Sequence, residues 1–252
     1  MLQLLLAATV NKRNNNKKCE PVLGSYFFCY NNYVGGFMEL NSYIEHTLLK
    51  ADAKEEEIKK LVEEAKKYNF LGVCINPSYV KYVKELLGNS NIKVVTVIGF
   101  PLGQNTEDVK IFETKKAISD GADEIDMVIN VGKLKDKKYD EIIAEIKNIK
   151  SAAGNHVLKV IIETDLLTKD EIRVASELSA QAGADFVKTS TGFVKNGVGA
   201  KVEDVEQMYK TVSPMGLKVK ASGGIRDKES AVALIKAGAA RLGTSSGVQI
   251  CQ

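Results

Sequence analysis

The alternation of short apolar runs with longer amphipathic segments is the feature that most constrains the fold of this chain. From Tyr43 onward the short runs suit buried strands, and the segments between them carry apolar residues at helical spacing, as Ile58, Leu61 and Val62 do in residues 54–68. The predicted strands are residues 43–47, 72–76, 92–98, 124–130, 157–163, 185–188, 217–220 and 240–243. The predicted helices are residues 54–68, 78–87, 106–119, 138–152, 168–181, 201–212 and 227–237.

This order of elements predicts one closed domain. The turns "DGAD", "QAGAD" and "KAGAA" precede three of the strands and suit a helix end that leads into a short loop. No linker-like stretch follows Met38. Eight strands that alternate with helices indicate an α/β fold, a single (β/α)8 TIM barrel. An open doubly wound sheet is the alternative, and the absence of a GxGxxG motif after the first strand disfavours it.

Residues 1–37 do not follow this pattern. Their apolar start, "MLQLLLAATV", is shorter than the roughly 20 residues that span a bilayer, and basic residues follow it rather than precede it as in a signal peptide. We expect an N-terminal extension that is disordered or a gene-model artefact, with the barrel domain at 38–252. An organelle-targeting segment is the alternative. Neither reading places the protein in a membrane.

Charge and cysteine content narrow the function classes. The chain has a formal net charge of +3, and the first 37 residues carry all of it, so the predicted barrel is neutral. A neutral barrel is not expected to bind nucleic acid. The four cysteines form no CxxC motif and only two histidines are present, so neither a disulfide framework nor a metal site is expected. We expect a reducing, cytoplasmic environment.

Two lysines occupy matching positions at the ends of predicted strands. Lys188 closes "DFVK" before Thr-Ser-Thr-Gly, and Lys220 closes "LKVK" before Ala-Ser-Gly-Gly. Active sites of TIM barrels lie at the carboxyl ends of the strands, and these two strands are neighbours, so we expect the lysines to face each other. Asp126, between Ile125 and Met127 on the fourth strand, is a pocket residue or a structural partner for a lysine.

Such a pair can make one lysine a nucleophile. A lysine attacks a carbonyl only as the neutral amine, and an ordinary pKa near 10.4 leaves it protonated at neutral pH. A second cation and a partly desolvated pocket both lower that pKa. We therefore predict that one lysine forms a Schiff base while the other stays charged. A single lysine would more simply cap its strand in solvent, but the pair together with Asp126 favours chemistry.

Glycine and serine clusters follow the last two strands. "SGGIR" (222–226) and "GTSSG" (243–247) stand where barrels of this kind often bind phosphate. Backbone N–H groups of Gly223 and Gly224, and those that open a helix after Ser245, can point at an anion. Either cluster alone could simply form a tight turn. Together they favour a phosphorylated substrate.

Eight motifs, in order, resemble the deoxyribose-phosphate aldolase family over roughly 210 residues from Glu39 onward. They are "YIEHTLLKADA", "GVCINPSYV", "VVTVIGFPLG", "EIDMVINVG", "LKVIIETDLLT", "FVKTSTGF", "KASGGIR" and "RLGTSSG". The resemblance implies a class I aldolase that cleaves 2-deoxy-D-ribose 5-phosphate to D-glyceraldehyde 3-phosphate and acetaldehyde, in deoxyribonucleotide catabolism. It implies no metal and no cofactor.

The resemblance also implies roles for individual residues. Lys188 is the expected Schiff-base lysine, Lys220 its activating partner, and Asp126 the carboxylate that moves protons through water. Asp126 and Lys220 would serve as proton donor and acceptor, which requires pKa values pushed apart by their surroundings. The residues expected to bind the phosphate are Gly192, Gly223, Gly224, Ser245, Ser246 and Arg226. Arg226 could equally be an exposed residue at a helix start.

The sequence departs from the family pattern at two positions. Glu45 stands where the family usually has aspartate, which leaves the role of that carboxylate open. Phe193 stands where some members carry a phosphate-binding lysine, so we expect the backbone and Arg226 to contribute more. Cys74 and His46 are interpreted as structural residues, a buried filler in the case of Cys74.

Two other functions stay open from the sequence. Another phosphosugar Schiff-base aldolase, or a transaldolase-like enzyme, would use a similar barrel. A catalytically silent barrel that binds a small molecule is the rival from another class, and the intact Asp126, Lys188 and Lys220 argue against it. Several predicted exposed helices could form a homodimer face, but none carries a conspicuous apolar stripe.

Overall fold

The computed structural model describes residues 33–34 and 37–252 of the chain. The chain divides into Met1–Met38 and a compact unit, Glu39–Gln252. Most of the expected extension 1–37 lies outside the described residues, so its disorder or absence stays a prediction. The described part of the first unit is an antiparallel pair of two-residue strands, β1 (Tyr33–Val34) and β2 (Phe37–Met38).

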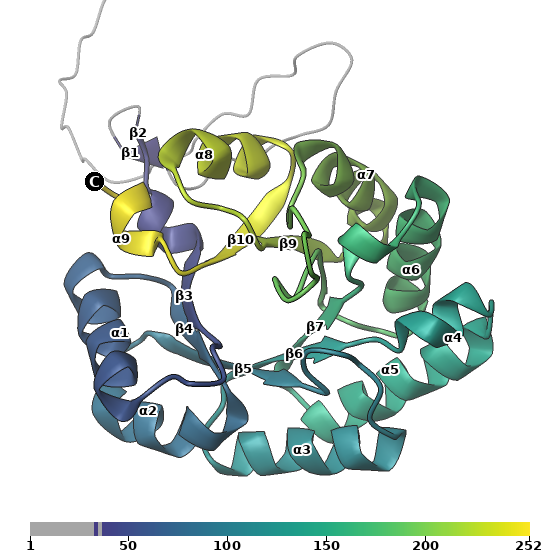
Figure 1. Cartoon of the computed structure of the whole chain (residues 1–252), viewed down its shortest axis with the longest axis horizontal. Coiled ribbons are helices and arrows are strands. Elements are labelled where there is room, and N and C mark those ends of the chain that lie inside the picture. The colour runs from purple at the N-terminus through teal and green to yellow at the C-terminus, as the bar shows by residue number, and fades with distance from the viewer. Residues whose placement is uncertain (1–32, 35–36) are drawn as a thin grey trace, which may run out of the picture. The chain divides into compact units, whose positions relative to one another are not determined.

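Eight parallel strands of the compact unit close into a barrel (Figure 1). In sequence order they are β3 (Ile44–Leu48), β4 (Gly72–Ile75), β5 (Lys93–Ile98), β6 (Glu124–Val128), β7 (Val157–Ile161), β8 (Phe186–Lys188), β9 (Lys218–Ser222) and β10 (Ala239–Thr244). Each strand pairs with its neighbours in sequence, and β10 pairs with both β9 and β3. The predicted (β/α)8 barrel is therefore confirmed, and the open-sheet alternative is wrong.

Helices connect successive strands and surround the barrel (Figure 1). They are α1 (Glu55–Tyr68), α2 (Val80–Leu87), α3 (Glu107–Ser119), α4 (Val131–Lys135), α5 (Tyr139–Ala153), α6 (Lys169–Gln181), α7 (Val202–Val212), α8 (Lys228–Lys236) and α9 (Gly247–Ile250). The longer ones match the predicted helices to within one or two residues at each end. Their apolar positions face inward, as Ile58, Leu61 and Val62 of α1 do.

Side-chain caps explain where two of the helices begin. Thr168 accepts a hydrogen bond from the Glu171 amide, and the Glu171 carboxylate in turn accepts one from the Thr168 amide. Asp227 accepts from the Ser230 amide at 2.8 Å at the start of α8. Thr106 stands at the same position before α3, but its side chain makes no capping hydrogen bond.

Two predicted strands are too long at their carboxyl ends. β6 ends at Val128, because Asn130 caps α4 by accepting a hydrogen bond from the Lys133 amide at 3.0 Å. β7 ends at Ile161, and Glu163 adopts a left-handed backbone conformation with φ of 61°. Apolar residues continue past both strand ends, so hydrophobicity alone did not reveal the turns.

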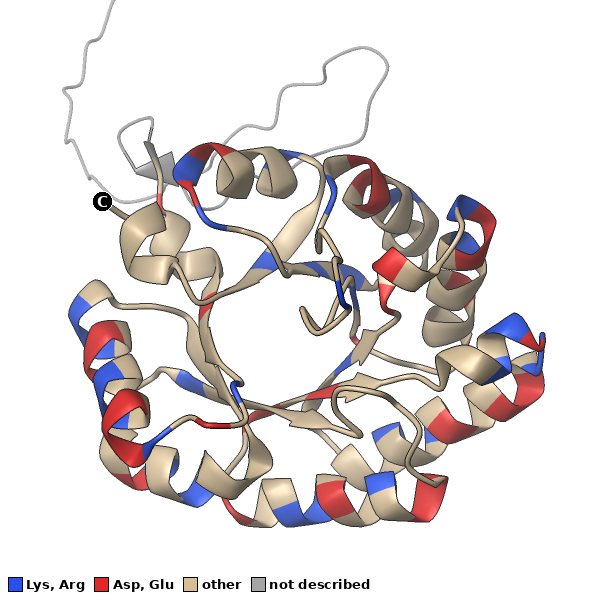
Figure 2. Cartoon of the chain, viewed as in Figure 1, with Lys and Arg blue, Asp and Glu red and all other residues tan. Residues whose placement is uncertain are grey.

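Charged residues are found on the outer helices and also on the barrel strands (Figure 2). Those on the helices follow the expected amphipathic pattern. Those inside the barrel are exceptional, because charged side chains are almost never fully buried without partners. The fully buried charged residues of the barrel strands are Glu45, Asp126, Lys159 and Lys220, and Glu124 and Lys188 are nearly as buried.

Candidate active site

The register of the barrel brings the two predicted lysines together. Lys188 of β8 lies opposite Lys220 of β9 in the strand pairing. Both side-chain nitrogens donate a hydrogen bond to the same oxygen of Asp126, Oδ2, at 2.7 Å from Lys188 and 2.6 Å from Lys220. The expectation that the lysines face each other at one level is met, and Asp126 is the group that joins them.

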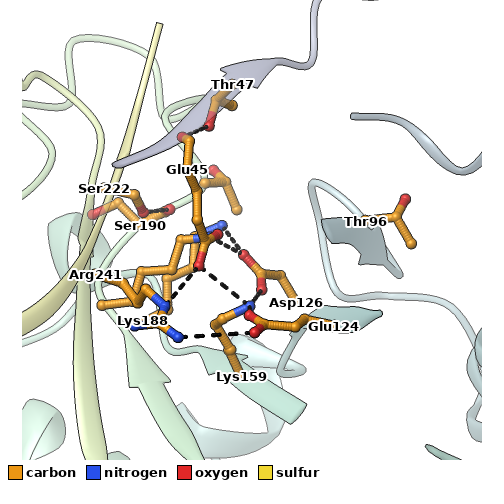
Figure 3. A network of polar contacts seen from close by, with 12 residues as sticks. Glu45, Thr47, Thr96, Glu124, Asp126, Lys159, Lys188, Ser190, Ser222 and Arg241 are labelled. Carbon is orange, nitrogen blue, oxygen red and sulfur yellow. Dashed lines mark hydrogen bonds and ion pairs between the residues drawn. The ribbon is translucent and has the colours of Figure 1, made fainter. Parts of the chain in front are cut away.

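Glu45 and Lys159 complete the buried cluster (Figure 3). Glu45 of β3 accepts a hydrogen bond from Lys220. Lys159 of β7 donates to Asp126 Oδ1 at 3.0 Å, and its ammonium nitrogen lies 2.6 Å from Glu124 Oε2 and 3.5 Å from Glu45 Oε1. Glu45 stands where the family usually has aspartate, and it keeps a carboxylate beside Lys220. Glu45 therefore belongs to the site.

The sequence reasoning missed Lys159. It stands in "LKVII", where a lysine interrupts an apolar strand much as Lys188 and Lys220 do, but it is not at the strand end. The pairing of β6 with β7 places Lys159 opposite Asp126, so a predicted strand register for the barrel could have revealed this contact. Arg241 of β10 was missed as well. Its guanidinium lies 3.7 Å from Glu45 and 3.9 Å from Glu124.

Burial and opposite charges compete to set the pKa values in the cluster. Burial alone would raise the pKa of Asp126, but the attraction of Lys159, Lys188 and Lys220 outweighs burial and holds it well below its ordinary value. Burial would lower the pKa of Lys220, and Asp126 with Glu45 outweighs that effect and raises it. Asp126 is therefore a carboxylate and Lys220 an ammonium, two groups whose pKa values are pushed apart.

The predicted phosphate-binding residues line one cavity together with Lys188. This cavity has a volume of about 340 Å³ and opens at the carboxyl ends of the strands. Its lining includes Gly192, Gly223, Gly224, Arg226, Ser245 and Ser246. No aspartate or glutamate is among the described residues that line it, and Lys50 adds a basic side chain that the sequence reasoning did not single out. The cavity wall is therefore suited to an anion.

Two glycines shape this wall. Gly223 and Gly224 have φ of 85° and 73°, values that residues with a side chain rarely adopt. A Cβ atom on Gly224 would lie 2.3 Å from the carbonyl oxygen of Val198. At the other cluster, the N–H of Ser246 donates to Thr244 Oγ1 at 2.9 Å. This amide is held in a local turn, and anion binding by the amides that open α9 stays a prediction.

Hydrogen bonds from the Thr-Ser-Thr segment hold the ends of neighbouring strands together. Thr189 donates to the Ser222 carbonyl, and Ser222 donates through its hydroxyl to the Ser190 carbonyl. Thr191 binds the buried carboxylate of Glu163 through its amide and its hydroxyl. These contacts explain why polar residues follow Lys188 directly. They brace the loop that carries Gly192.

Phe193 lines the cavity with an apolar ring, and Cys74 lies in an apolar cluster. The Phe193 ring is about half exposed and packs edge-to-face against Phe100, with centroids 5.1 Å apart. Cys74 is fully buried in an apolar cluster with Val95 and Val97, and burial raises the pKa of its thiol. Its interpretation as a filler agrees with this packing.

His46 is held on the outer side of β3. Its Nε2 lies 2.8 Å from the carboxylate of Glu64 on α1, and its ring packs against Phe70. These contacts agree with a structural role. Within residues 33–34 and 37–252, no cluster of three or more His, Cys, Asp or Glu side chains is arranged to hold a metal ion. No helix in the same part of the chain is both long and apolar enough to cross a membrane.

Comparison with known proteins places the chain in a family. The model of the DeoC/LacD family aldolases matches residues 43–252. Deoxyribose-phosphate aldolases of Staphylococcus carnosus and Finegoldia magna are each 56% identical over 215 residues, which covers 85% of this chain and 96% and 100% of theirs. The tetrameric deoxyribose phosphate aldolase of Aeropyrum pernix superposes with a TM-score of 0.76 at 37% identity, covering 84% of this chain and 89% of that one. The chain belongs to the DeoC/LacD family of aldolases.

Proposed function

We propose that the protein is a deoxyribose-phosphate aldolase that cleaves 2-deoxy-D-ribose 5-phosphate reversibly to D-glyceraldehyde 3-phosphate and acetaldehyde through a Schiff base on Lys188. Its relatives are deoxyribose-phosphate aldolases, which supports the substrate. The observation that carries the mechanism is the position of the lysines. Lys188 lines the cavity, while Lys159 and Lys220 are fully buried behind it. Only Lys188 among these three is placed to meet a substrate carbonyl.

Formal charges in the cluster also support Lys188 as the lysine that reacts with the substrate. Without Lys188 the cluster holds three carboxylates, Glu45, Glu124 and Asp126, and three cations, Lys159, Lys220 and Arg241. Lys188 is a fourth basic residue beside three carboxylates, so it has no carboxylate of its own to compensate a positive charge. Buried sites disfavour uncompensated charge. Lys220 then acts as the neighbouring cation that the sequence predicted.

The reaction begins with addition of the Lys188 amine to C1 of the open-chain substrate. Loss of water gives an iminium ion, which withdraws electrons from C2. The C2–C3 bond then breaks while the C3 hydroxyl loses its proton, so the aldehyde of glyceraldehyde 3-phosphate leaves and an enamine stays on Lys188. Protonation at C2 and addition of water release acetaldehyde and restore the amine.

Asp126 is the group that we assign to the proton transfers. Its Oδ2 lies 2.7 Å from the reacting nitrogen, and its low pKa makes it a carboxylate able to accept a proton through a bridging water. Lys220, held as an ammonium between Asp126 and Glu45, stabilises that carboxylate, and the proton that Asp126 accepts from the C3 hydroxyl returns to C2 of the enamine. These assignments follow from opposite pKa shifts of neighbouring groups.

The phosphate of the substrate would bind in the cavity at the loops after β8, β9 and β10. Gly192, Gly223 and Gly224 allow close approach of an anion, and Ser245, Ser246, Arg226 and Lys50 line the same wall. Backbone turns and positive side chains without a lining carboxylate favour this assignment. For a substrate of this class we propose a role in deoxyribonucleotide catabolism, with no nucleic-acid partner.

The test is borohydride reduction in the presence of acetaldehyde, followed by peptide mass spectrometry. The expected result is an ethyl adduct confined to the peptide that contains Lys188, and loss of the adduct in Lys188→Met. An adduct on Lys220 would exchange the two roles. A folded protein that gives no adduct would favour the binding-protein alternative.

The substrate is tested separately. Cleavage of 2-deoxyribose 5-phosphate is expected to exceed cleavage of fructose 1-phosphate or fructose 1,6-bisphosphate. The reverse order would favour another phosphosugar Schiff-base aldolase, since the fold and Lys188 chemistry are compatible with both. Sedimentation analysis would test the predicted homodimer against the tetramer described for the Aeropyrum pernix protein.

A further inference from the structure

Lys159 is a buried cation that the proposed reaction does not use. Its side chain is fully buried, it is absent from the lining of the substrate cavity, and it contacts three carboxylates from two other strands. Burying an ammonium group is costly, so a lysine in this place needs a compensating role. The contacts of Lys159 with Asp126 and Glu45 indicate what that role is.

Lys159 and Lys220 bind opposite oxygens of the same two carboxylates. Lys220 donates to Oδ2 of Asp126 and to Oε2 of Glu45. Lys159 donates to Oδ1 of Asp126 and lies 3.5 Å from Oε1 of Glu45. The two lysines and two carboxylates therefore form a closed ring of alternating charge, and we call these four residues the charge ring.

The ring restrains the carboxylate that faces the reactive lysine. The terminal torsion of an aspartate is broad and roughly two-fold, so a carboxylate held at one oxygen can still turn. Asp126 is held at Oδ1 by Lys159 from one side and at Oδ2 by Lys220 from another. This leaves Oδ2 directed at Lys188. Catalysis depends on such orientation, because a misplacement of about 1 Å can cost roughly 100-fold in rate.

We propose that Lys159 is a positioning residue for the aldol reaction: by binding Asp126 Oδ1 it fixes the carboxylate plane with Oδ2 toward Lys188, and it contacts no substrate atom. This inference rests on the proposed function, since it assigns the proton transfers to Asp126. Glu124, 2.6 Å from Lys159, anchors the ammonium group from the far side.

The charges that face Asp126 give the proposal a pH signature. Lys159, Lys188 and Lys220 approach it from β7, β8 and β9, Glu45 faces it from β3, and Glu124 precedes it on β6. Arg241 of β10 faces the two glutamates. Among the lysines, Lys159 makes the largest contribution to lowering the pKa of Asp126 against burial. Removal of Lys159 therefore raises the pKa of Asp126. As the pH is lowered, activity that needs ionised Asp126 is then lost at a higher pH than in the wild type.

A second buried pair provides a matched control. Lys110 of α3 is also fully buried and forms an ion pair of 3.0 Å with Glu145 of α5. It donates to the Val128 carbonyl and contacts none of the charge-ring residues in the described structure. Lys110→Met thus deletes a buried ammonium from the same molecule. It separates the general cost of breaking a buried pair from an effect on Asp126.

The experiment compares wild type, Lys159→Met, Lys159→Gln and Lys110→Met. Each full-length protein is examined for its melting temperature, for kcat and KM with 2-deoxyribose 5-phosphate across pH, and for deuterium exchange into the methyl group of acetaldehyde. Lys159→Gln keeps an N–H donor without the charge and serves if Lys159→Met does not fold. Borohydride trapping on Lys188 reports whether the Schiff base still forms.

For both Lys159 variants we expect kcat and methyl exchange to fall by about 10-fold or more, with KM changed by less than about three-fold. The acid limb of the kcat profile moves to higher pH, and trapping on Lys188 persists. Lys110→Met is expected to lose stability while its kcat stays within about two-fold of wild type and its acid limb stays in place.

A Lys159 variant with the wild-type acid limb, or with a kcat equal to that of Lys110→Met, would overturn the proposal. Failure of both Lys159 variants to fold while Lys110→Met folds would overturn it in favour of a purely structural role. Absence of any Lys188 adduct in the folded wild type identifies a different failure, that of the proposed function itself, and the positioning role would be lost with it.

Discussion

Replacing Lys220 by methionine tests the electrostatics of the site most directly. Lys220 is fully buried and lies between the carboxylates of Asp126 and Glu45, with its nitrogen 2.6 Å from Asp126 Oδ2. Methionine fills a similar volume but supplies no charge. The substitution leaves two buried carboxylates with Lys159, Lys188 and Arg241 as their remaining cations.

The expected loss can be estimated from these contacts. Removing one partner of a buried ion pair costs about 3–5 kcal/mol. We expect the lower end, about 3 kcal/mol, because Lys159 still contacts both Asp126 and Glu45. For a domain of roughly 150–250 residues, 1 kcal/mol shifts the melting temperature by about 2–4 °C, so the variant should melt about 6–12 °C lower.

The loss should depend on pH in a defined direction. The folded-state pKa values of Asp126 and Glu45 are depressed, so these groups contribute stability above their unfolded values of about 3.9 and 4.3, and that stability is lost as pH falls through the folded values. Without Lys220 both depressions shrink. The difference in the free energy of unfolding between wild type and variant is therefore at its full value above about pH 5 and narrows as the pH falls below about pH 4.

Urea unfolding at several pH values would measure this difference, and a double-mutant cycle would assign it. Glu45→Gln removes one of the two carboxylates that Lys220 binds. Residues in one ion-pair network couple by about 0.5–3 kcal/mol, so Lys220→Met/Glu45→Gln should lose less stability than the sum of the single variants. Strict additivity, or a stability difference that does not change with pH, would refute the electrostatic reasoning.

Three further predictions concern the cavity and its surroundings. Gly224→Ala should raise KM for 2-deoxyribose 5-phosphate about 10-fold or more with a smaller change in kcat, because a Cβ would lie 2.3 Å from the Val198 carbonyl oxygen at a φ of 73°. An unchanged KM in steady-state assays would contradict the assignment of this wall to the phosphate. Phe193→Lys should lower KM for the phosphorylated substrate, but not for unphosphorylated 2-deoxyribose, because it places a cation on the cavity wall. Cys74 should react with a thiol reagent only after unfolding, because it is fully buried and burial raises its pKa; rapid labelling of folded protein would show that its cluster opens.

Local patterns in the sequence were sufficient for much of the architecture. Apolar runs of strand length placed all eight barrel strands, and the spacing of Ile58, Leu61 and Val62 placed the inner face of α1, since side-chain periodicity is a property of the local backbone. Lys188 and Lys220 could be paired because each was predicted to end a strand and the strands are consecutive; Lys188 does end β8, whereas β9 continues to Ser222. The turns at Asn130 and Glu163 were missed, because side-chain capping and a left-handed residue ended those elements rather than a change in hydrophobicity.

The sequence by itself determined the order of the elements, the polar residues at their carboxyl ends and, by its motifs, the family. Only the tertiary structure decided which charges meet. In the sequence, Lys159 is a single lysine within an apolar strand. Closure of the barrel brings it to Asp126 on the adjacent strand and to Glu45 on the opposite side of the barrel. The pKa values of Asp126 and Lys220 depend on burial and on distances of a few ångströms between strands far apart in the chain, because Coulomb interactions act through space and not along the sequence.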